Sequence, residues 1–210
     1  MKQNKAFVAG LTGPAGCGKS YICKILKELT GALVLDTDTI ARNQAAKGGI
    51  SYNAIVREFG TGILLPNGEL DRPALSAIVF NDAEKLKLLN SITHPNVISE
   101  CKKLIRENRD KYSLIIVESA ILVSSHCNEF CDEVWFVYST KEERAERLKI
   151  TRGYDDARIK SVMKSQNTVK YFRETSDETI NNRKAADSAA LEKSLKRLLD
   201  KKNISIVSCR

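Results

Sequence analysis

Short apolar runs alternate with amphipathic stretches along this chain, a pattern typical of a parallel sheet that helices cover on both faces. Four apolar runs predict buried strands, and Ile204–Val207 near the end of the chain predicts a fifth. The pattern therefore predicts an α/β fold of three layers, a five-stranded parallel sheet flanked by helices. The four runs are Ala6–Leu11, Ala32–Leu35, Leu114–Val117 and Val134–Tyr138.

The segments between these strands carry apolar residues at helical spacing. In Gly18–Leu29 such residues recur every three or four positions, and the following Thr30-Gly31 predicts the end of that helix. Another helix is expected directly after the second strand, where Thr37 or Asp38 suits the N-cap position. Further helices are predicted at Ser51–Phe59, Arg72–Phe80, Asp82–Arg106, Lys141–Thr151 and, after a break at Arg152-Gly153-Tyr154, up to Gln166.

A glycine-rich loop follows the first predicted strand and opens the first predicted helix. Residues 13–20 match the phosphate-loop pattern G-x-x-x-x-G-K-[ST] at every position. Its glycines allow main-chain N–H groups to point at a triphosphate, and the helix N-terminus favours an anion. In such a loop Lys19 reaches the β- and γ-phosphates, and the Ser20 hydroxyl binds Mg²⁺. The residues expected to bind a nucleoside triphosphate are Gly13, Pro14, Ala15, Gly16, Cys17, Gly18, Lys19 and Ser20.

The phosphate loop suggests functions for two helical segments further along the chain. With 210 residues the chain is expected to form one P-loop domain with a core of residues 1–46 and 113–210, and the loop alone does not separate a kinase from a GTPase, an ATPase or a passive nucleotide binder. Residues 47–112 contain no convincing strand, so this helical block is the expected acceptor-binding insertion. The basic helix–turn–helix at about residues 144–166 follows the fourth strand, where a lid over bound phosphates is expected.

The formal net charge is +8, and residues 141–210 hold 18 Lys and Arg against 11 Asp and Glu. Excess positive charge suits nucleic acid, a membrane surface or phosphate-rich small molecules. The basic residues alternate with acidic ones and lack the aromatic residues of a single-strand binder. Charge alone therefore leaves a small phosphorylated ligand and RNA both open.

Six cysteines, at positions 17, 23, 101, 127, 131 and 209, show no paired framework, so free thiols in a reducing compartment are expected. No apolar run approaches the roughly 20 residues of a membrane span, and the first run leads into the phosphate loop as a strand would. We therefore expect a cytoplasmic protein. Cys17 lies beside Lys19 at a helix N-terminus, where a lowered thiol pKa and sensitivity to oxidation are a hypothesis.

The remaining motifs resemble those of the dephospho-CoA kinase family over nearly the whole chain. Residues 10–20 look like the opening motif of that family, and Leu35–Arg42 is similar to its D-x-D-x-x-A-R segment. The resemblance implies a kinase that uses ATP and Mg²⁺ to phosphorylate the ribose 3′-hydroxyl of dephospho-CoA, with small-molecule partners and neither nucleic acid nor membrane. The other matching positions are Asn67–Arg72, Phe80, Leu89-Asn90, Ile92–Pro95, Gln166 and Asp177–Asn182.

The resemblance also implies catalytic roles, which the position of two carboxylates supports. Asp36 and Asp38 follow the second strand, at the carboxyl edge of the sheet where ligands bind in open α/β folds. Asp38 would accept the proton of the acceptor hydroxyl as a base, and Asp36 would be structural or bind Mg²⁺ through water. Arg152, together with Arg147, would neutralise the transferring phosphoryl group from the lid.

On the acceptor side, the resemblance implies Arg42, Arg72, His94 and Glu118. His94 is equally well explained as a packed or capping histidine before Pro95. Glu118 ends the third predicted strand and could approach either Mg²⁺ or the acceptor.

The sequence departs from the family pattern after Glu118, where Ser119–Leu122 stands in place of the usual apolar residue and Pro-Leu-Leu, and in the lid, where Gly153 replaces an acid. Two other interpretations therefore stay open. One is a related P-loop kinase with another nucleotide or nucleoside acceptor, which an acceptor panel would reveal. The other is a non-catalytic nucleotide- or RNA-binding protein, which salt-sensitive RNA retention without phosphotransfer would reveal.

Overall fold

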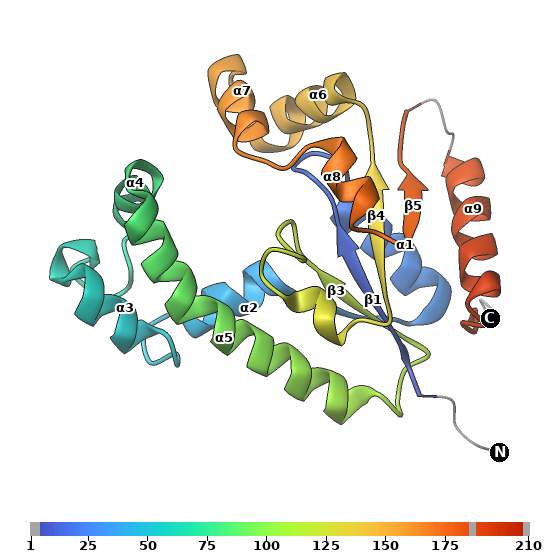
Figure 1. Ribbon diagram of the computed structural model, residues 1–210, viewed down its shortest axis with the longest axis horizontal. Helices are drawn as coiled ribbons and strands as arrows, with labels where there is room; N and C mark the ends of the chain where they lie inside the picture. The colour runs from blue at the N-terminus through green and yellow to red at the C-terminus, as the bar shows by residue number, and fades with distance from the viewer. Residues whose placement is uncertain (1–4, 185–187, 208–210) are drawn as a thin grey trace. The chain divides into compact units, whose positions relative to one another are not determined.

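A computed structural model describes residues 5–184 and 188–207 of the chain, so Cys209 lies outside the described residues. The chain divides into two compact units (Figure 1). The first unit comprises Met1–Leu35 and Ile105–Arg210, and the second comprises Asp36–Leu104. The helical insertion expected over residues 47–112 overlaps the second unit for most of its length.

The five-stranded parallel sheet that the sequence predicts is confirmed. The strand order is β2-β3-β1-β4-β5, which places β1 at the centre. β1 pairs in parallel with β3 from Phe7 opposite Leu114 to Leu11 opposite Glu118, and on its other side with β4. The connection after β1 leads to β2 on one side of the sheet, and the connection after β4 leads to β5 on the other. The carboxyl ends of the neighbouring strands β1 and β4 therefore lie at the kind of switch point where open α/β sheets bind ligands. The strands are β1 (Phe7–Thr12), β2 (Leu33–Asp36), β3 (Leu114–Glu118), β4 (Glu133–Tyr138) and β5 (Glu178–Asn181).

The fifth strand is not where the sequence pattern placed it. Ile204–Val207 is not a strand, and Glu178–Asn181 pairs with β4 instead. β5 is an edge strand with one buried residue, Ile180, so it lacks the continuous apolar run of a central strand. The apolar character of Ile204 is explained by packing rather than by a strand, because this residue belongs to the same hydrophobic core as the leucines of the last helix.

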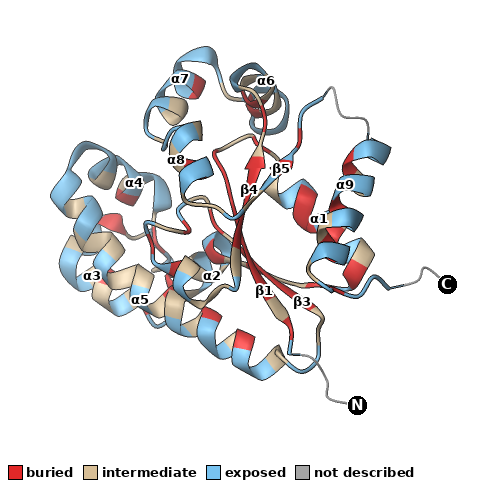
Figure 2. Cartoon of the chain, turned by 45° about the vertical axis from the view of Figure 1, so that its right-hand side comes forward, coloured by how far each residue is buried: buried red, intermediate tan, exposed pale blue. Residues whose placement is uncertain are grey.

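The larger core of the first unit lies between one face of the sheet and two helices, α1 (Lys19–Thr30) and α9 (Ser188–Lys201). α1 contributes Ile22 and Leu26 to this core, and α9 contributes three leucines spaced four residues apart, which is the spacing of one helix face. Figure 2 shows buried segments, in red, on both α1 and α9 and along the central strands. The core fixes α1, and with it the loop that precedes this helix, against the sheet.

The opposite face of the central strands is covered by shorter segments. These are the turns after β3 with the 3₁₀-helix η2 (Cys127–Phe130), and the helix α8 (Val169–Glu174). Phe172 of α8 stacks on Phe136 of β4 with ring centroids 5.3 Å apart. At Gly10 a Cβ atom would lie 2.5 Å from Leu122, so glycine lets this segment pack directly on β1.

Two charged helices follow β4, as predicted: α6 (Lys141–Arg152) and α7 (Asp156–Lys164). α6 begins with a capping box, in which Thr140 and Glu143 each bond the other's main-chain N–H. Gly153 ends α6 in the left-handed conformation, and Asp155 caps α7. These signals separate α6 from α7 by a tight turn.

The second unit is helical, as expected, and has a core of its own formed by Ala45, Ile55, Ile63, Leu70 and Leu75. An isolated antiparallel bridge joins Leu64 to Leu70. The N-cap of the first helix is Asp36 rather than Thr37 or Asp38, because the Asp36 side chain accepts the first free N–H groups. The elements are α2 (Thr37–Gln44), α3 (Tyr52–Phe59), the 3₁₀-helix η1 (Thr61–Ile63), α4 (Arg72–Asn81) and α5 (Ala83–Asn108), which continues into the first unit.

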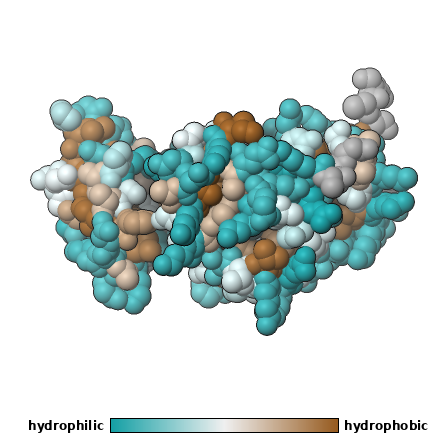
Figure 3. Space-filling view, turned by 90° about the horizontal axis from the view of Figure 1, so that it is seen from above, coloured by the Kyte–Doolittle hydropathy of each residue, from teal (hydrophilic) through white to brown (hydrophobic). Residues whose placement is uncertain are grey.

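The surface is mostly polar. On the face shown in Figure 3, hydrophilic side chains dominate and apolar side chains form small separate groups. Ile50, Phe80 and Ile150 are the most exposed large apolar side chains of the described residues, at 71%, 73% and 75%. None of the helices within residues 5–184 and 188–207 has the length and apolar character that crossing a membrane requires.

An ion-pair network at the amino ends of β4 and β5 gives a prediction for stability. Lys202, whose side chain is 14% exposed, contacts Glu133 and lies 3.2 Å from Glu178. Lys202→Met is expected to lower the free energy of unfolding at pH 7 by about 1–3 kcal/mol, because two partly buried carboxylates lose their shared cation. Urea denaturation measures this loss.

The pH dependence and a neighbouring lysine provide the controls. Hydrogen bonds from Lys201 and Lys202 lower the pKa of Glu178 in spite of its partial burial. Its contribution is therefore present above the unfolded pKa and lost as the pH falls through the folded pKa, so the effect of Lys202→Met should shrink in acid. The side chain of Lys201 is 65% exposed, so Lys201→Met should cost less than about 1 kcal/mol. An equal loss in both variants would contradict the network.

Candidate active site

The loop of residues 13–18 follows β1 and leads into α1. Gly13, Gly16 and Gly18 have φ angles of +147°, +79° and +93°, conformations that side chains disfavour. Gly18 is the N-cap of α1 and supplies no side-chain hydrogen bond to the first turn. The N–H groups at the start of α1 are therefore available to an anion, as a phosphate loop requires.

Two of these glycines are also required by the residues packed outside the loop. A Cβ atom at Gly16 would lie 2.7 Å from the carbonyl oxygen of Arg144, and one at Gly18 would lie 2.2 Å from Asn182 Nδ2. The loop therefore has a wall of protein on its outer side. Replacement of either glycine would push the loop away from this wall as well as strain its backbone.

Hydrogen bonds from this wall hold the main-chain oxygen of Cys17. Ser139 Oγ donates to it at 3.0 Å, Asn182 Nδ2 at 2.8 Å and Arg147 Nη1 at 3.1 Å. Arg147 also donates to Ser139 Oγ and to the Asn182 carbonyl, both at 2.8 Å. Fixing this carbonyl outward leaves the N–H groups of the loop to face the opposite way. A direct contact of Arg147 with phosphate stays a prediction.

Lys19 and Ser20 begin α1 with their polar groups placed for phosphate and metal. Lys19 Nζ donates to the Gly13 carbonyl at 2.9 Å, so its ammonium lies along the loop. Ser20 Oγ donates to Glu118 Oε1 at 3.0 Å, and the Cys23 thiol donates to Glu118 Oε2 at 3.4 Å. A hydroxyl and a carboxylate oxygen side by side are the hard oxygen donors that Mg²⁺ prefers. The structure thus places Glu118 next to Ser20. This position favours Mg²⁺, rather than the acceptor, as the group that Glu118 would approach.

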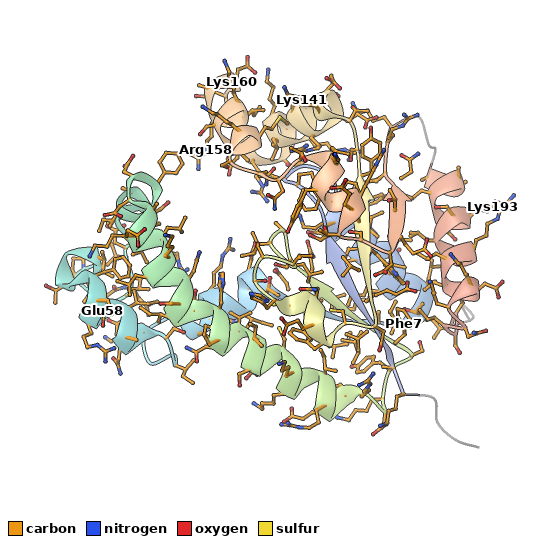
Figure 4. All side chains as sticks on the ribbon, in the orientation of Figure 1. Phe7, Glu58, Lys141, Arg158, Lys160 and Lys193 are labelled. Atoms are coloured by element: carbon orange, nitrogen blue, oxygen red, sulfur yellow. The ribbon has the colours of Figure 1, made fainter. Side chains whose placement is uncertain are left out.

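Arg152 is the last residue of α6, and it belongs to a cationic cluster at the turn into α7. The Tyr154 ring lies 6.0 Å from the Arg152 guanidinium carbon and 4.5 Å from that of Arg158. A hydrogen bond from Arg152 lowers the pKa of the Tyr154 hydroxyl, and the positive charge of Arg158 acts in the same direction. Figure 4 labels Arg158 and Lys160 on α7 and Lys141 on α6. This concentration of positive charge suits an anionic ligand.

The other predicted residues lie in the second unit. The Asp36 carboxylate accepts the N–H groups of Asp38 and Thr39 at 3.0 and 3.3 Å and the Thr39 hydroxyl at 2.6 Å. These bonds occupy Asp36 as the cap of α2, and the Asp38 carboxylate takes no part in them. Arg72 Nη2 donates to the Arg42 carbonyl at 3.1 Å, and His94 precedes Pro95 within α5. The roles of all five residues stay predictions.

The structure therefore groups the predicted residues by unit. The phosphate loop, Glu118, Arg147 and Arg152 belong to the first unit, and the acidic pair with the acceptor-side residues belongs to the second. Sequence reasoning missed Arg144 and Ser139, which hold the loop from outside. Ser139 directly follows β4, and this position at the carboxyl end of a strand was a usable signal.

The hypothesis of a lowered thiol pKa at Cys17 is wrong, and its sensitivity to oxidation stays a hypothesis. Its side chain is fully buried, and burial raises the thiol pKa although Lys19, Arg144 and Arg147 act in the opposite direction. We expect iodoacetamide at pH 8 to leave Cys17 unmodified in the folded protein and to alkylate it after denaturation, because the thiolate is the reactive form. Peptide mass spectrometry measures both. Alkylation of Cys17 in the folded protein as fast as that of the more exposed Cys131 would contradict the burial.

Comparison with known proteins shows which family the chain belongs to. The sequence model of the family described as dephospho-CoA kinase matches residues 7–189. A dephospho-CoA kinase of Moorella thermoacetica is 38% identical over 162 residues, which is 76% of this chain and 76% of that protein.

Two solved structures share the fold. The crystal structure of TT1252 from Thermus thermophilus has a TM-score of 0.80 at 24% identity and covers 94% of this chain and 98% of its own. A dephospho-CoA kinase from Campylobacter jejuni has a TM-score of 0.60 at 21% identity, with coverage of 92% and 96%. At these identities the structures establish the P-loop kinase fold, and the sequence match over most of the chain establishes the relationship. The chain belongs to the dephospho-CoA kinase family.

Proposed function

We propose that this chain transfers the γ-phosphoryl group of ATP to the ribose 3′-hydroxyl of dephospho-CoA, giving CoA and ADP. The observation that carries the proposal is the phosphate loop with Lys19 along it and Ser20 against Glu118. Membership of the family supports the choice of acceptor. A kinase of this kind uses an alcohol as the phosphoryl acceptor.

The donor half of the reaction belongs to the first unit. Main-chain N–H groups at the end of the phosphate loop and the start of α1 bind the triphosphate, and the Lys19 ammonium neutralises charge on its β- and γ-oxygens. Ser20 and Glu118 would hold Mg²⁺, which would supply a positive charge shared between phosphate oxygens. Because catalysis of phosphoryl transfer consists of positioning and electrostatic stabilisation, these fixed charges account for most of the expected rate.

The acceptor half is proposed for the second unit. Asp38 accepts the proton of the ribose hydroxyl or orients that hydroxyl in line with the γ-phosphate. Arg42, Arg72 and His94 bind the acceptor, and the helical insertion of residues 47–112 carries much of this site. Asp36 keeps its proposed link to Mg²⁺ through water, in addition to its cap of α2.

The segment of residues 144–166 is the proposed lid. Its positive charge at Arg152 and Arg158 would neutralise the equatorial oxygens of the transferring group. We also propose a cytoplasmic location, which is supported by the reduced state of the described cysteines, at positions 17, 23, 101, 127 and 131.

The test is a dephospho-CoA assay with purified protein and Mg²⁺-ATP. Mass spectrometry of the product should show CoA carrying a new 3′-phosphate, with one ADP formed for each CoA. Chelation of the metal should stop the reaction, and added Mg²⁺ should restore it. Strong turnover of a nucleoside monophosphate with none of dephospho-CoA would replace the proposed acceptor, and no ADP with any acceptor would overturn the kinase.

A further inference from the structure

Both main-chain polar groups of Ala15, in the middle of the phosphate loop, are held by hydrogen bonds from outside the loop. Arg144 Nε donates to the Ala15 carbonyl at 2.9 Å, and the Ala15 N–H donates to Gln166 Oε1 at 3.1 Å. The same Gln166 oxygen accepts from Arg144 Nη2 at 3.1 Å. The three residues thus form a closed triangle of hydrogen bonds outside the loop.

The triangle is anchored by a buried charge. Arg144 is 7% exposed, and burial lowers the pKa of its guanidinium, which remains charged at neutral pH. A buried guanidinium needs acceptors for its N–H groups, because an unpaired buried charge is costly. Gly16 packs so tightly on the Arg144 backbone that a Cβ atom would lie 2.7 Å from its carbonyl oxygen. The start of α6 and the loop therefore have little room to shift independently.

The two side chains come from opposite ends of one segment. Arg144 lies in the first turn of α6, and Gln166 lies two residues beyond the end of α7. Residues 145–165 between them include the cationic cluster of Arg152, Tyr154 and Arg158. Both ends of this segment are therefore hydrogen-bonded to the same residue of the phosphate loop, Ala15. A change in the main-chain conformation of Ala15 would alter the hydrogen bonds at both ends of the segment.

We propose that Gln166 is a positioning residue for nucleotide binding. It fixes the main chain of Ala15, directly and through Arg144, and it links the end of α7 to the phosphate loop. Gln166 orients the Arg144 guanidinium, which holds the Ala15 carbonyl outward. The Gly16 N–H belongs to the same peptide unit as this carbonyl and faces the opposite way, the orientation that a triphosphate needs. A nucleotide that fixes the loop then also fixes the end of α7. The inference rests on the nucleotide site of the proposed function, and it adds a link between that site and the α6–α7 segment.

Three variants separate this role from a general loss of stability. Gln166→Leu keeps a similar size and removes the acceptor, while Gln166→Glu keeps an oxygen for the Ala15 N–H and pairs with the Arg144 charge. Ser165→Ala is the control, since this exposed neighbour bonds only within α7 at the Val162 carbonyl. Gln166→Asn shortens the side chain, so its amide oxygen no longer reaches the Ala15 N–H, and this variant replaces Gln166→Leu if the leucine variant does not fold. Thermal unfolding without nucleotide shows which variants are folded.

The first measurement is the Kd of Mg²⁺-ATP without acceptor. Gln166→Leu, or Gln166→Asn in its place, is expected to raise this Kd about tenfold, because two hydrogen bonds are lost and a buried charge is left partly unpaired. Gln166→Glu and Ser165→Ala should stay within about twofold of the parent protein. A Kd that does not change in Gln166→Leu, or an equal rise in Gln166→Glu, would overturn the proposal.

The second measurement is amide hydrogen exchange with and without Mg²⁺-ATP. If Gln166 had a purely structural role, its replacement would not change the effect of the nucleotide on exchange in α7. In the parent protein, nucleotide should slow exchange in residues 13–20 and also in α7. In folded Gln166→Leu the slowing in α7 should be lost, and persistence of the full effect there would sink the proposed link. Because both readouts use ATP alone, failure to phosphorylate dephospho-CoA would overturn the proposed function and leave this inference standing.

Discussion

Replacing Lys19 by alanine is expected to lower kcat/KM for ATP by about 10³-fold, the largest effect of any single change in the phosphate loop. Lys19 is the first residue of α1, and its ammonium lies 2.9 Å from the Gly13 carbonyl, along the loop that frames the triphosphate. Alanine leaves the N–H groups in place and removes the fixed cation. Since charge grows on the phosphoryl oxygens during transfer, the transition state loses more than the bound substrate does.

Detection of ADP with dephospho-CoA as acceptor measures this effect, and a second lysine of the same helix provides the control. The Lys24 side chain is 72% exposed and pairs only weakly with Glu28, at 3.9 Å. Lys24→Ala should therefore keep kcat/KM within about twofold of the parent protein. Thermal unfolding should give similar midpoints for both variants. Near-normal turnover by Lys19→Ala would mean that the triphosphate binds elsewhere.

The loop and four of the five strands were predictable because their signals are local. A phosphate loop is defined by glycines at fixed spacing, and the central strands are apolar on both faces, so each is recognisable within a few residues. Val134–Tyr138 shows this well, since it is predicted within one residue of β4. β5 was not predicted because Ile180 is its only apolar residue, whereas β2, at the other edge of the sheet, begins with the apolar run Leu33–Leu35. Its strand character comes from pairing with β4 rather than from its own sequence.

The position of Ser139 after a strand was a usable signal, but the contacts that build the outer wall of the phosphate loop were not predictable, for a related reason. Ser139, Asn182 and Arg144 contact residues of the loop that are more than 120 positions away in sequence. No local pattern marks an arginine that will be buried against a distant carbonyl. The cap of α2 shows the same limit at short range, because Asp36, Thr37 and Asp38 all suit an N-cap and the backbone geometry selects Asp36.

The second large effect is expected at Asp38. Asp38→Asn should lower kcat by about 10²-fold or more while the Kd of ATP stays within about twofold, because the amide cannot accept the proton of the acceptor hydroxyl. The change should leave α2 intact, since the cap uses the Asp38 N–H and the Asp36 carboxylate, and both remain. A fall in kcat can therefore be assigned to the lost carboxylate rather than to a frayed helix.

Steady-state kinetics with dephospho-CoA distinguish a base from a binding group at this position. A base contributes in the transition state, so its loss lowers kcat, whereas a group that only binds the acceptor raises KM and leaves kcat unchanged. Asp82→Asn is the matched control in the same unit, because Asp82 accepts the N–H groups of Glu84 and Lys85 at the start of α5 and asparagine caps as well. It should behave as the parent protein does. If Asp38→Asn instead keeps its kcat and raises only the acceptor KM, the proton must leave the ribose hydroxyl by another route, and Asp38 serves to hold the acceptor.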